Sequence, residues 1–456
     1  MTRRVVLWFV LFAGVVGLAA LVIVPKIIYP ANPAVTPELT DAVRNLSGKV
    51  PVFPGAEGFG ADTPAGRGGR VLRVTSLEAA GPGTLREALE TPGPRSIVFE
   101  VGGVIRLSES LVIPHPFVTV AGQTAPSPGI TLAGAGLVIA THDALVRHLR
   151  VRVGDAMPGP PGDARDGLSV YPGGDGRAFN VVVDHCSVSW AVDEGASHWG
   201  AGVSDVTFRN CIFSENLSRS IHPKGEHSKG LLLGNHGKRI AVIGCLFASN
   251  RQRSPYVKGD VSALVVNNLI YNPGTYAVHV GDYESVGPNI AGIYGNVLWP
   301  GPDTWRLAGM VTVHLHAQRS AVVCVMDNLH TGRALWRELA FSNRRRDIAH
   351  YDNSPVQVKP LTLRRASETP LWVLANAGAR PGDRDAADLR AVRGALARTG
   401  RIIDSQEQVG GMPAVAEVRR PLALPENPDG DDNGNGHTNL EEWLHGLARR
   451  VEGGVL

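Results

Sequence analysis

The sequence has few of the features that mark disulfide-rich, zinc-binding or nucleic-acid-binding proteins. Its four cysteines form no CxxC pair and no clustered metal spacing, so buried free thiols are expected rather than a disulfide scaffold or a zinc site. The formal net charge is only +3. Because no block of lysine and arginine of the kind that follows phosphates is present, nucleic acid is not an expected partner.

Long amphipathic helices are also scarce after the N-terminus. The chain contains 54 glycines and 32 prolines, and only 19% of its 456 residues are charged. This composition favours a turn-rich, all-β body. The length is sufficient for one long domain with appendages.

The N-terminus is the exception to this pattern. Arg3 and Arg4 precede an uncharged run from Val5 to Val24, and a helix of about 20 such residues crosses a hydrocarbon core of about 30 Å. No small-x-small cleavage site follows directly, so an uncleaved anchor is favoured over a signal peptide in residues 1–28, with a linker in 29–50. We expect an extracytoplasmic protein, either secreted or anchored to the membrane.

One phrase recurs through the middle of the chain: alternating β-branched residues, then a small or amide residue, then a second short apolar stretch. It reads VTVAGQ, LVRHLRVR, VVVDHCSVSW, VTFRNCIFSEN, AVIGCLFASN, LVVNNLIYN, IYGNVLWP and MDNLHTG. Coils that repeat every 20 to 40 residues or so bury their apolar faces by stacking. The repeat therefore predicts a parallel β-helix in residues 51–420, whereas a β-sandwich would have turns every 8 to 12 residues or so.

Aligning these phrases predicts an interior column of like residues. Its members are Gln123, Leu149, Cys186, Cys211, Cys245, Asn268, Asn296 and Asn328. Stacked amides can hydrogen-bond along such a column and leave no buried polar group without a partner. We therefore expect a structural role for these residues.

The repeat fades beyond about residue 333, where the NRRRD stretch at 343–347 indicates a surface loop. One amphipathic helix is predicted later, because Leu389, Val392 and Leu396 share a face after the acidic residues 383–385. We expect it to pack against the solenoid.

Several segments together resemble the bacterial pectate lyase superfamily. They include PGAEGFGADTPAGRGG, VTSLEAAGPGTLREAL, PRSIVFEVGGVI, VTVAGQTAP, VVVDHCSVSWAVDE, HSKGLLLG, NRQRSPYVKG and VVNNLIYN, and later RDAADLR and QEQVGGMP. The resemblance spans roughly residues 52–413. It implies a right-handed parallel β-helix that binds Ca²⁺ and cleaves pectate, an acidic polysaccharide, by β-elimination.

The elimination itself dictates what the site needs. The hydrogen at C5 of the sugar lies next to a charged carboxylate and is very weakly acidic, so the site must neutralise that carboxylate and hold a base at C5. Calcium can do the first and requires several oxygen ligands. Asp166, Asp193 and Glu194 resemble the calcium-binding acids of the family, whereas Ser197 stands where the family has a further acid.

A cationic cluster follows in the next two repeats. Its members are Arg219, His222, Lys224, His227, Lys229, Arg251, Arg253 and Lys258. Such crowding near acidic residues predicts a groove for a polyuronate, although a solvated cationic face is the simpler alternative.

Within this cluster, Arg253 resembles the catalytic arginine of the family, and Lys229 resembles its substrate-binding lysine, with Lys224 as a rival. Lys258, Arg251, His227 and Tyr256 complete the expected substrate contacts, and Tyr256 replaces a basic residue of the family.

Guanidinium is an unusual base because it is normally protonated. Arg253 is the base if calcium and neighbouring cations lower its pKa; otherwise Lys224, Lys229 or His227 accepts the proton. His185 lies beside Asp184 and Ser187, but adjacent strand residues point to opposite faces and form no catalytic triad. We interpret Asp184 and His185 as structural.

A second calcium motif lies at the C-terminus, in residues 421–456. The segment DDNGNGHTNLEE fits the pattern D-x-[DN]-x-[DN]-G-x5-E, followed by a predicted helix from Thr438 to about Arg450. The expected ligands are Asp431, Asn433, Asn435, the His437 carbonyl, Asn439 and Glu442. A polar Asp/Asn/Gly turn is the alternative.

Three functions are compatible with these patterns. The first is a monomeric lyase acting on pectate or another polyuronate. The second is a non-catalytic, cell-surface β-helix protein that binds acidic glycans. The third is a glycoside hydrolase, which would need two catalytic carboxylates at a fixed separation and for which no acid in an apolar setting is evident near Asp184 or Asp193.

Overall fold

The structure is a computed structural model. It describes residues 50–156, 158–281, 287–315, 321–332, 339–342, 348–350, 356–358 and 360–453. The predicted anchor (1–28), almost all of the linker (29–50) and the NRRRD stretch lie outside these residues. Within the described part of the chain, no helix is both long and apolar enough to cross a bilayer.

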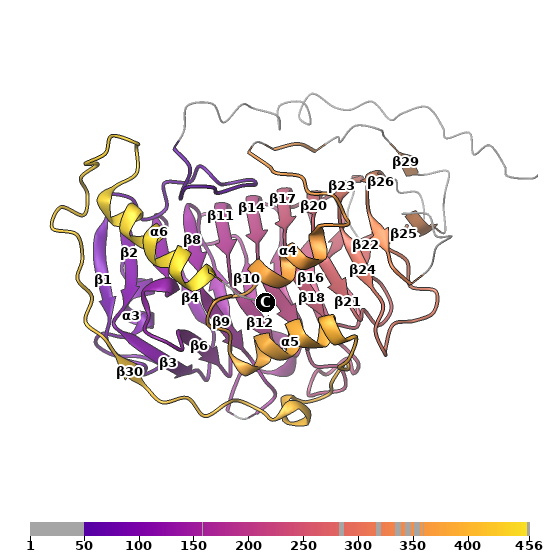
Figure 1. The fold of residues 1–456 in the computed structure, drawn as a ribbon, viewed down its shortest axis with the longest axis horizontal. Helices are drawn as coiled ribbons and strands as arrows, with labels where there is room; N and C mark the ends of the chain where they lie inside the picture. The colour runs from indigo at the N-terminus through magenta and orange to yellow at the C-terminus, as the bar shows by residue number, and fades with distance from the viewer. Residues whose placement is uncertain are drawn as a thin grey trace, which may run out of the picture.

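Successive rungs of strands stack along one axis, and their strands form the three parallel sheets of a parallel β-helix (Figure 1). The first sheet contains β1 (Arg70–Val74), β2 (Arg95–Phe99), β5 (Val118–Ala121), β8 (Ala144–Arg147), β11 (Ala178–Asp184), β14 (Val203–Arg209), β17 (Lys238–Ile243), β20 (Ser262–Val266), β23 (Asn289–Tyr294), β26 (Ala321–Met326) and β29 (Ile348–His350).

The second sheet contains β4 (Leu111–Ile113), β7 (Leu137–Ile139), β10 (Leu168–Val170), β13 (Glu194–Trp199), β16 (Lys229–Gly234), β19 (Tyr256–Lys258), β22 (Val278–Gly281), β25 (Val311–His314) and β28 (Leu339–Ser342). The third contains β3 (Val101–Arg106), β6 (Ile130–Ala133), β9 (Leu149–Arg152), β12 (Ser187–Ser189), β15 (Ile212–Ser214), β18 (Leu246–Ala248), β21 (Leu269–Tyr271), β24 (Val297–Trp299), β27 (Leu329–His330) and the antiparallel β30 (Val418–Arg419). Because β28 and β29 pair in parallel with β25 and β26, the solenoid continues beyond residue 333, where the repeated phrase fades from the sequence.

The predicted interior column is present from Leu149 to Asn328. Asn268 Nδ2 donates to Asn296 Oδ1 at 2.8 Å, and Asn296 Nδ2 donates to Asn328 Oδ1 at 2.9 Å. All four cysteines are buried and form no disulfide. Gln123 was misaligned: it lies in the 3-10 turn η2 (Gly122–Thr124), and the strand register places Ile130 beside Leu149 instead.

Most of the repeated phrases bend between the first and third sheets at a residue with positive φ. His148, His185, Asn210, Asn267 and Asp327 have φ angles of 59°, 49°, 51°, 51° and 53°. Polar residues with short or flat side chains tolerate this left-handed conformation better than β-branched ones. Glycines, Gly244 and Gly295, occupy the equivalent bends of two further rungs, and the side chains of His148, His185, Asn210 and Asn267 are buried.

Helices cover the end and two faces of the solenoid. Helix α3 (Leu85–Glu90) buries Leu85 and Leu89 in the solenoid core. Helices α4 (Thr369–Asn376) and α5 (Ala386–Ala397) pack on the third sheet, and α6 (Asn439–Glu452) packs on β2 and β5 of the first. Figure 1 shows these three helices lying across the strands. The remaining short turns are η3 (Gly162–Ala164) and η5 (Gln406–Val409).

Helix α5 confirms the predicted helix, but its buried face differs from the predicted one. Leu396 is 47% exposed, whereas Ala391, Val392 and Ala395 are buried. The reason is a pair of arginines on β9. The fully buried Arg152 donates to Asp385 at 2.9 Å and to Asp388 at 2.8 Å, so the acidic start of the helix is turned toward the sheet.

Candidate active site

The outer face of the second sheet carries a cavity of about 570 Å³. Helices α4, α5 and α6 pack on the other two sheets. The cavity lies over β7, β10, β13, β16 and β19, and its lining residues are Ser110, Leu137, Val138, Asp163, Ala164, Asp166, Ser169, Tyr171, Asp193, Glu194, Ser197, Trp199, Lys224, His227, Leu232, Arg253 and Lys258. Acidic and cationic side chains from four successive rungs therefore meet at one surface.

The acidic part of the cavity is formed by Asp166, Asp193 and Glu194. One carboxylate oxygen from each lies within 4.8 Å of the other two. Asp166 immediately precedes the β10 rung, and the other two stand at the start of β13, so the stacking of adjacent rungs brings together residues 27 and 28 positions apart. Three carboxylates at this spacing repel one another unless a cation or protons intervene.

Asp166 is held in a network of hydroxyl groups. Its Oδ2 accepts from Ser169 at 2.9 Å, from Ser197 at 3.1 Å and from Tyr171 at 3.2 Å. Burial, and then the charge of Asp193, raise its pKa to about 6 against the donation from these hydroxyls. Ser197 thus helps to orient Asp166.

Asp193 is paired with two stacked histidines. Its Oδ1 lies 3.0 Å from His227 Nε2 and 3.7 Å from His222 Nε2, and the two ring centroids are 3.5 Å apart. Burial alone would raise the pKa of Asp193, but the hydrogen bond from His227 and the nearby positive charges lower it overall.

Arg253 lines the same cavity and forms an ion pair with Glu194 of the acidic cluster. It lies three residues before the start of β19 and has a left-handed φ of 65°, a strained conformation that is often retained at functional sites. Burial lowers the pKa of its guanidinium, while the charges of Asp193 and Asp166 counteract this.

The structure brings most, but not all, of the predicted site residues to this cavity. Lys224, His227 and Lys258 line it. Lys229 is buried at the start of β16 and is not among the lining residues; burial, and then the charge of Arg251, lower its pKa to about 8. Tyr256 stacks on His279 with a centroid distance of 4.1 Å.

Arg251 and Arg219 line a neighbouring cavity of about 630 Å³. There Arg251 pairs with Glu226 at 2.9 Å and Arg219 pairs with the same carboxylate at 3.4 Å. Exposed Trp305 and Asp404 also line this cavity. The cationic residues are therefore divided between two neighbouring cavities, and their positions along the sequence did not predict this division.

The sequence interpretation missed Asp163, Ser169, Tyr171 and Trp199. In Trp199, the indole lies 4.8 Å from Lys258 Nζ, so an aromatic face and an ammonium group adjoin at the edge of the cavity. A signal was present, because Ser197 and Trp199 are two residues apart on one strand and must point to the same face.

The predicted C-terminal motif forms a compact loop before α6. Asp431 accepts from the backbone of Asn435 at 3.1 Å and of Gly436 at 2.8 Å, and Asn435 Nδ2 donates to Glu442 at 2.7 Å. Thr438 caps the helix, which runs from Asn439 to Glu452. Asn433 Oδ1 also accepts from the backbone of Asn435 at 3.0 Å, and Asn435 Oδ1 accepts from the backbone of His437 at 2.9 Å, so five of the six predicted ligand residues are linked by hydrogen bonds.

No family model matches the chain. The chain is 38% identical to the "Probable pectate lyase C" of Aspergillus flavus over 272 residues, which is 59% of each protein. It is 39% identical to the "Probable pectate lyase C" of Neosartorya fischeri over 55% of each protein. The chain thus aligns with less than two thirds of the length of these curated relatives.

Solved structures share the fold at low sequence identity. The major cedar pollen allergen Jun a 1 matches with a TM-score of 0.52 and 17% identity, covering 70% of this chain and 91% of the allergen. A pectate lyase bound to a hexasaccharide matches with a TM-score of 0.52 and 13% identity, covering 74% of this chain and 99% of that enzyme. The chain is therefore similar in sequence to proteins named as probable pectate lyases over part of their length, and it shares the parallel β-helix fold of the solved pectate lyase.

Proposed function

We propose that this chain is a polysaccharide lyase that cleaves pectate or a related polyuronate by calcium-assisted β-elimination. The observation that carries the proposal is the cavity on the second sheet, where Asp166, Asp193 and Glu194 converge on one wall and Arg253 faces them. The aligned relatives are named as pectate lyases, which supports the same reaction class.

The acidic cluster suits a hard divalent cation. Its donors are carboxylate oxygens within 4.8 Å of one another, and calcium prefers several oxygen ligands at about 2.3–2.6 Å. Crowding by Asp193 contributes to the raised pKa of Asp166, so a cation would relieve a repulsion already present. When bound, calcium neutralises the substrate carboxylate and makes the C5 hydrogen more acidic.

The remaining residues bind and orient the sugar acid. Lys224 and Lys258 line the cavity and supply positive charge for uronate carboxylates. Trp199 offers an apolar ring face beside Lys258, and a pyranose ring can pack on such a face. Together they hold an acidic sugar against the acidic cluster.

Arg253 is the residue we assign to the proton transfer at C5. Burial lowers the pKa of its guanidinium and so favours the neutral form. Its ion pair with Glu194 holds it next to the acidic residues that would bind calcium. His227 and Lys224 also line the cavity and are the alternative bases. Lys229 has a lowered pKa of about 8, but it is buried and is not among the residues that line the cavity.

The test is the ultraviolet absorbance of the unsaturated product on adding polygalacturonate and calcium to wild type, Arg253→Ala and Arg253→Lys. We expect both variants to bind polygalacturonate within a few-fold of wild type but to lose about 10²–10³-fold in kcat, since a charge-stabilising group of the transition state is removed or displaced. Arg239→Ala is the matched control, because Arg239 pairs with Asp205 on the first sheet, outside the cavity.

The outcomes separate the candidate functions. Loss of turnover in His227→Ala with activity retained in Arg253→Lys would assign the base to His227. Binding of polygalacturonate by wild type with no absorbance change across a panel of polyuronates would favour a non-catalytic glycan-binding protein. New reducing ends without unsaturated product would indicate hydrolysis.

The C-terminal loop is a second calcium site in this proposal, with a structural role. Its ligands would be Asp431, Asn433, Asn435, the carbonyl of His437, Asn439 and Glu442. The contacts of Asp431 and the link from Asn435 to Glu442 already bring these groups together. Calorimetric titration with calcium should show one equivalent fewer in Asp431→Ala than in wild type; an unchanged stoichiometry would identify the loop as a simple polar turn.

The proposed substrate and ions place the protein outside the cytoplasm. Millimolar calcium and cell-wall polyuronates are extracellular, and the segment 1–28 is proposed as the export signal or anchor, followed by the linker 29–50. The body from 51 to 420 would act as a monomer. Fractionation of cells that express the full chain, followed by sequencing of the mature N-terminus, distinguishes an anchor from a cleaved signal.

A further inference from the structure

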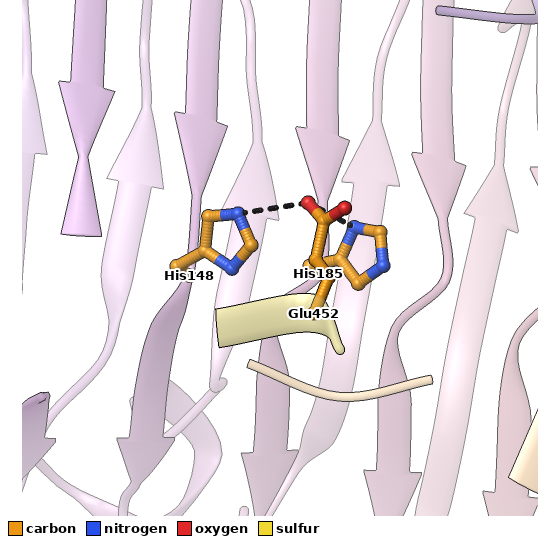
Figure 2. A group of neighbouring side chains, drawn as sticks. All are labelled: His148, His185 and Glu452. Carbon is orange, nitrogen blue, oxygen red and sulfur yellow. Dashed lines mark ion pairs between the residues drawn. The ribbon is translucent and has the colours of Figure 1, made fainter. Parts of the chain in front are cut away.

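A second cluster of metal-binding side chains lies outside the active-site cavity. His148 and His185 occupy the same bend in successive rungs, since the strand register aligns the residues that follow them. Their rings stack with centroids 5.3 Å apart and planes 16° apart. Glu452, at the end of α6, reaches between them, as Figure 2 shows. The cluster joins the C-terminal helix to the solenoid.

His148 presents a lone pair to this carboxylate. Its Nδ1 lies 2.7 Å from the carbonyl oxygen of Ala379, and because a carbonyl only accepts hydrogen bonds, Nδ1 must carry the hydrogen. The ring is fully buried, which favours its neutral form. Its Nε2 is then an acceptor without a hydrogen-bond partner, and it faces another acceptor, Glu452 Oε1, at 3.2 Å. Two acceptors at this distance require a cation or an added proton between them.

The ligand atoms are spaced as a tetrahedral metal ion requires. Glu452 Oε1 lies 3.2 Å from His148 Nε2 and 3.6 Å from His185 Nδ1. Metal–ligand bonds of about 2.0–2.1 Å in tetrahedral geometry separate ligand atoms by about 3.3–3.4 Å. The contact of His148 Nδ1 with a backbone carbonyl is also the outer-shell bond that usually orients a metal-binding imidazole.

The ion pairs around the cluster leave acceptor positions on Glu452 that a divalent ion could occupy. Asp184 pairs with Arg147 at 2.8 Å and with Arg209 at 2.9 Å, and its Oδ2 lies 2.8 Å from His185 Nδ1. Arg147 also donates to Glu452 Oε1 at 2.6 Å, but a carboxylate offers about four acceptor positions. Bound metal would take the place of the proton that His185 shares with Asp184.

We propose that His148, His185 and Glu452 form a site for a divalent transition metal of the zinc class, which fastens α6 to the solenoid. Two imidazoles and one carboxylate suit Zn²⁺ and not Ca²⁺, which prefers oxygen ligands alone. The cluster lies at the bends that follow the first sheet, whereas the proposed lyase cavity lies on the second, so the role of this metal is structural. Its binding would stabilise the C-terminal helix and, through it, the adjoining loop at 431–438.

The test is titration of the chelator-treated full chain with zinc, followed by calorimetry and by thermal denaturation. At a free zinc concentration 100 times the dissociation constant, linkage favours the folded state by roughly 100-fold, and the melting temperature rises. Glu452→Gln should bind zinc at this site more than about 10-fold more weakly, since loss of even an outer-shell partner costs about 10–100-fold. His148→Gln should behave alike; because the Glu452 side chain is 22% exposed and that of His148 is fully buried, Glu452→Gln guards against a folding defect in the His148 variant.

Two controls separate this site from others. His236→Gln removes a histidine that pairs with a carboxylate, Asp260, on another surface, and should leave zinc binding intact. His227→Gln removes the histidine beside Asp193 in the lyase cavity, and the stabilisation should persist in it. The proposal is overturned if zinc stabilises Glu452→Gln as much as wild type, if His227→Gln abolishes the effect, or if only a proton binds, so that stability depends on pH but not on zinc.

Discussion

Acidification should weaken calcium binding at Asp166, because its carboxyl group must lose a proton before it can bind a cation. Burial and the charge of Asp193 raise the pKa of Asp166 to about 6, from an ordinary value near 3.9. The calcium-free carboxyl is therefore mostly protonated below pH 6 and mostly ionised above it. Protons and calcium compete for this site across a pH range in which ordinary aspartates are fully ionised.

The magnitude follows from this pKa. With a pKa of about 6, roughly one Asp166 in eleven is ionised at pH 5 and roughly ten in eleven at pH 7. The apparent dissociation constant for calcium should therefore be about tenfold higher at pH 5 than at pH 7. Direct calorimetric titration at pH 5, 6, 7 and 8 measures this without relying on turnover.

Without calcium, the raised pKa of Asp166 predicts that acidification stabilises the folded protein, whereas it weakens calcium binding. The folded protein holds the Asp166 proton up to about pH 6, whereas the unfolded chain releases it near pH 4, so the folded state loses stability as pH rises between these values. At pH 7, Asp166→Asn should thus raise the free energy of unfolding by up to about 3 kcal/mol in chelator, while abolishing calcium binding in the cavity but not in the loop at 431–442. Asp260→Asn is the control, since Asp260 pairs with Lys238 at the surface. Equal calcium affinity at pH 5 and 7, or a destabilised Asp166→Asn, would refute the reasoning.

Two further predictions concern the solenoid. Asn296→Leu removes the amide that links Asn268 to Asn328. Because buried hydrogen-bonding groups lose their partners, the variant should lower the free energy of unfolding, measured by chemical denaturation, by about 2–4 kcal/mol. A change below about 1 kcal/mol would show that the asparagine column contributes little to stability. Asp388→Ala leaves the buried Arg152 with one carboxylate partner fewer and should lower the free energy of unfolding by about 3–5 kcal/mol. Amide hydrogen exchange should increase first in α5. A uniform increase throughout the chain would contradict the idea that Arg152 holds the start of α5 in place.

The repeat made the solenoid predictable because each rung must bury its own apolar alternation against the next. The side chains from Cys186 to Asn328 therefore fell into one column as expected, and Asp166, Asp193 and Glu194 met because adjacent rungs stack. Gln123 was misaligned since its phrase ends in a turn, not in a second strand. The buried face of α5 was also mispredicted, because apolar periodicity does not reveal that two buried arginines attract its acidic start.

The sequence by itself determined the class of fold, the order of the rungs and the residue types that could bind calcium and a uronate, since these depend on local periodicity and on composition. Only the tertiary structure decided which cations share the cavity: Arg253 and Lys258 line it, while Arg251 turns to Glu226 in the next one. It also brought Glu452 to His148 and His185. Such contacts depend on loop paths and on the docking of α6, and these are set by packing between segments hundreds of residues apart, which no local pattern encodes.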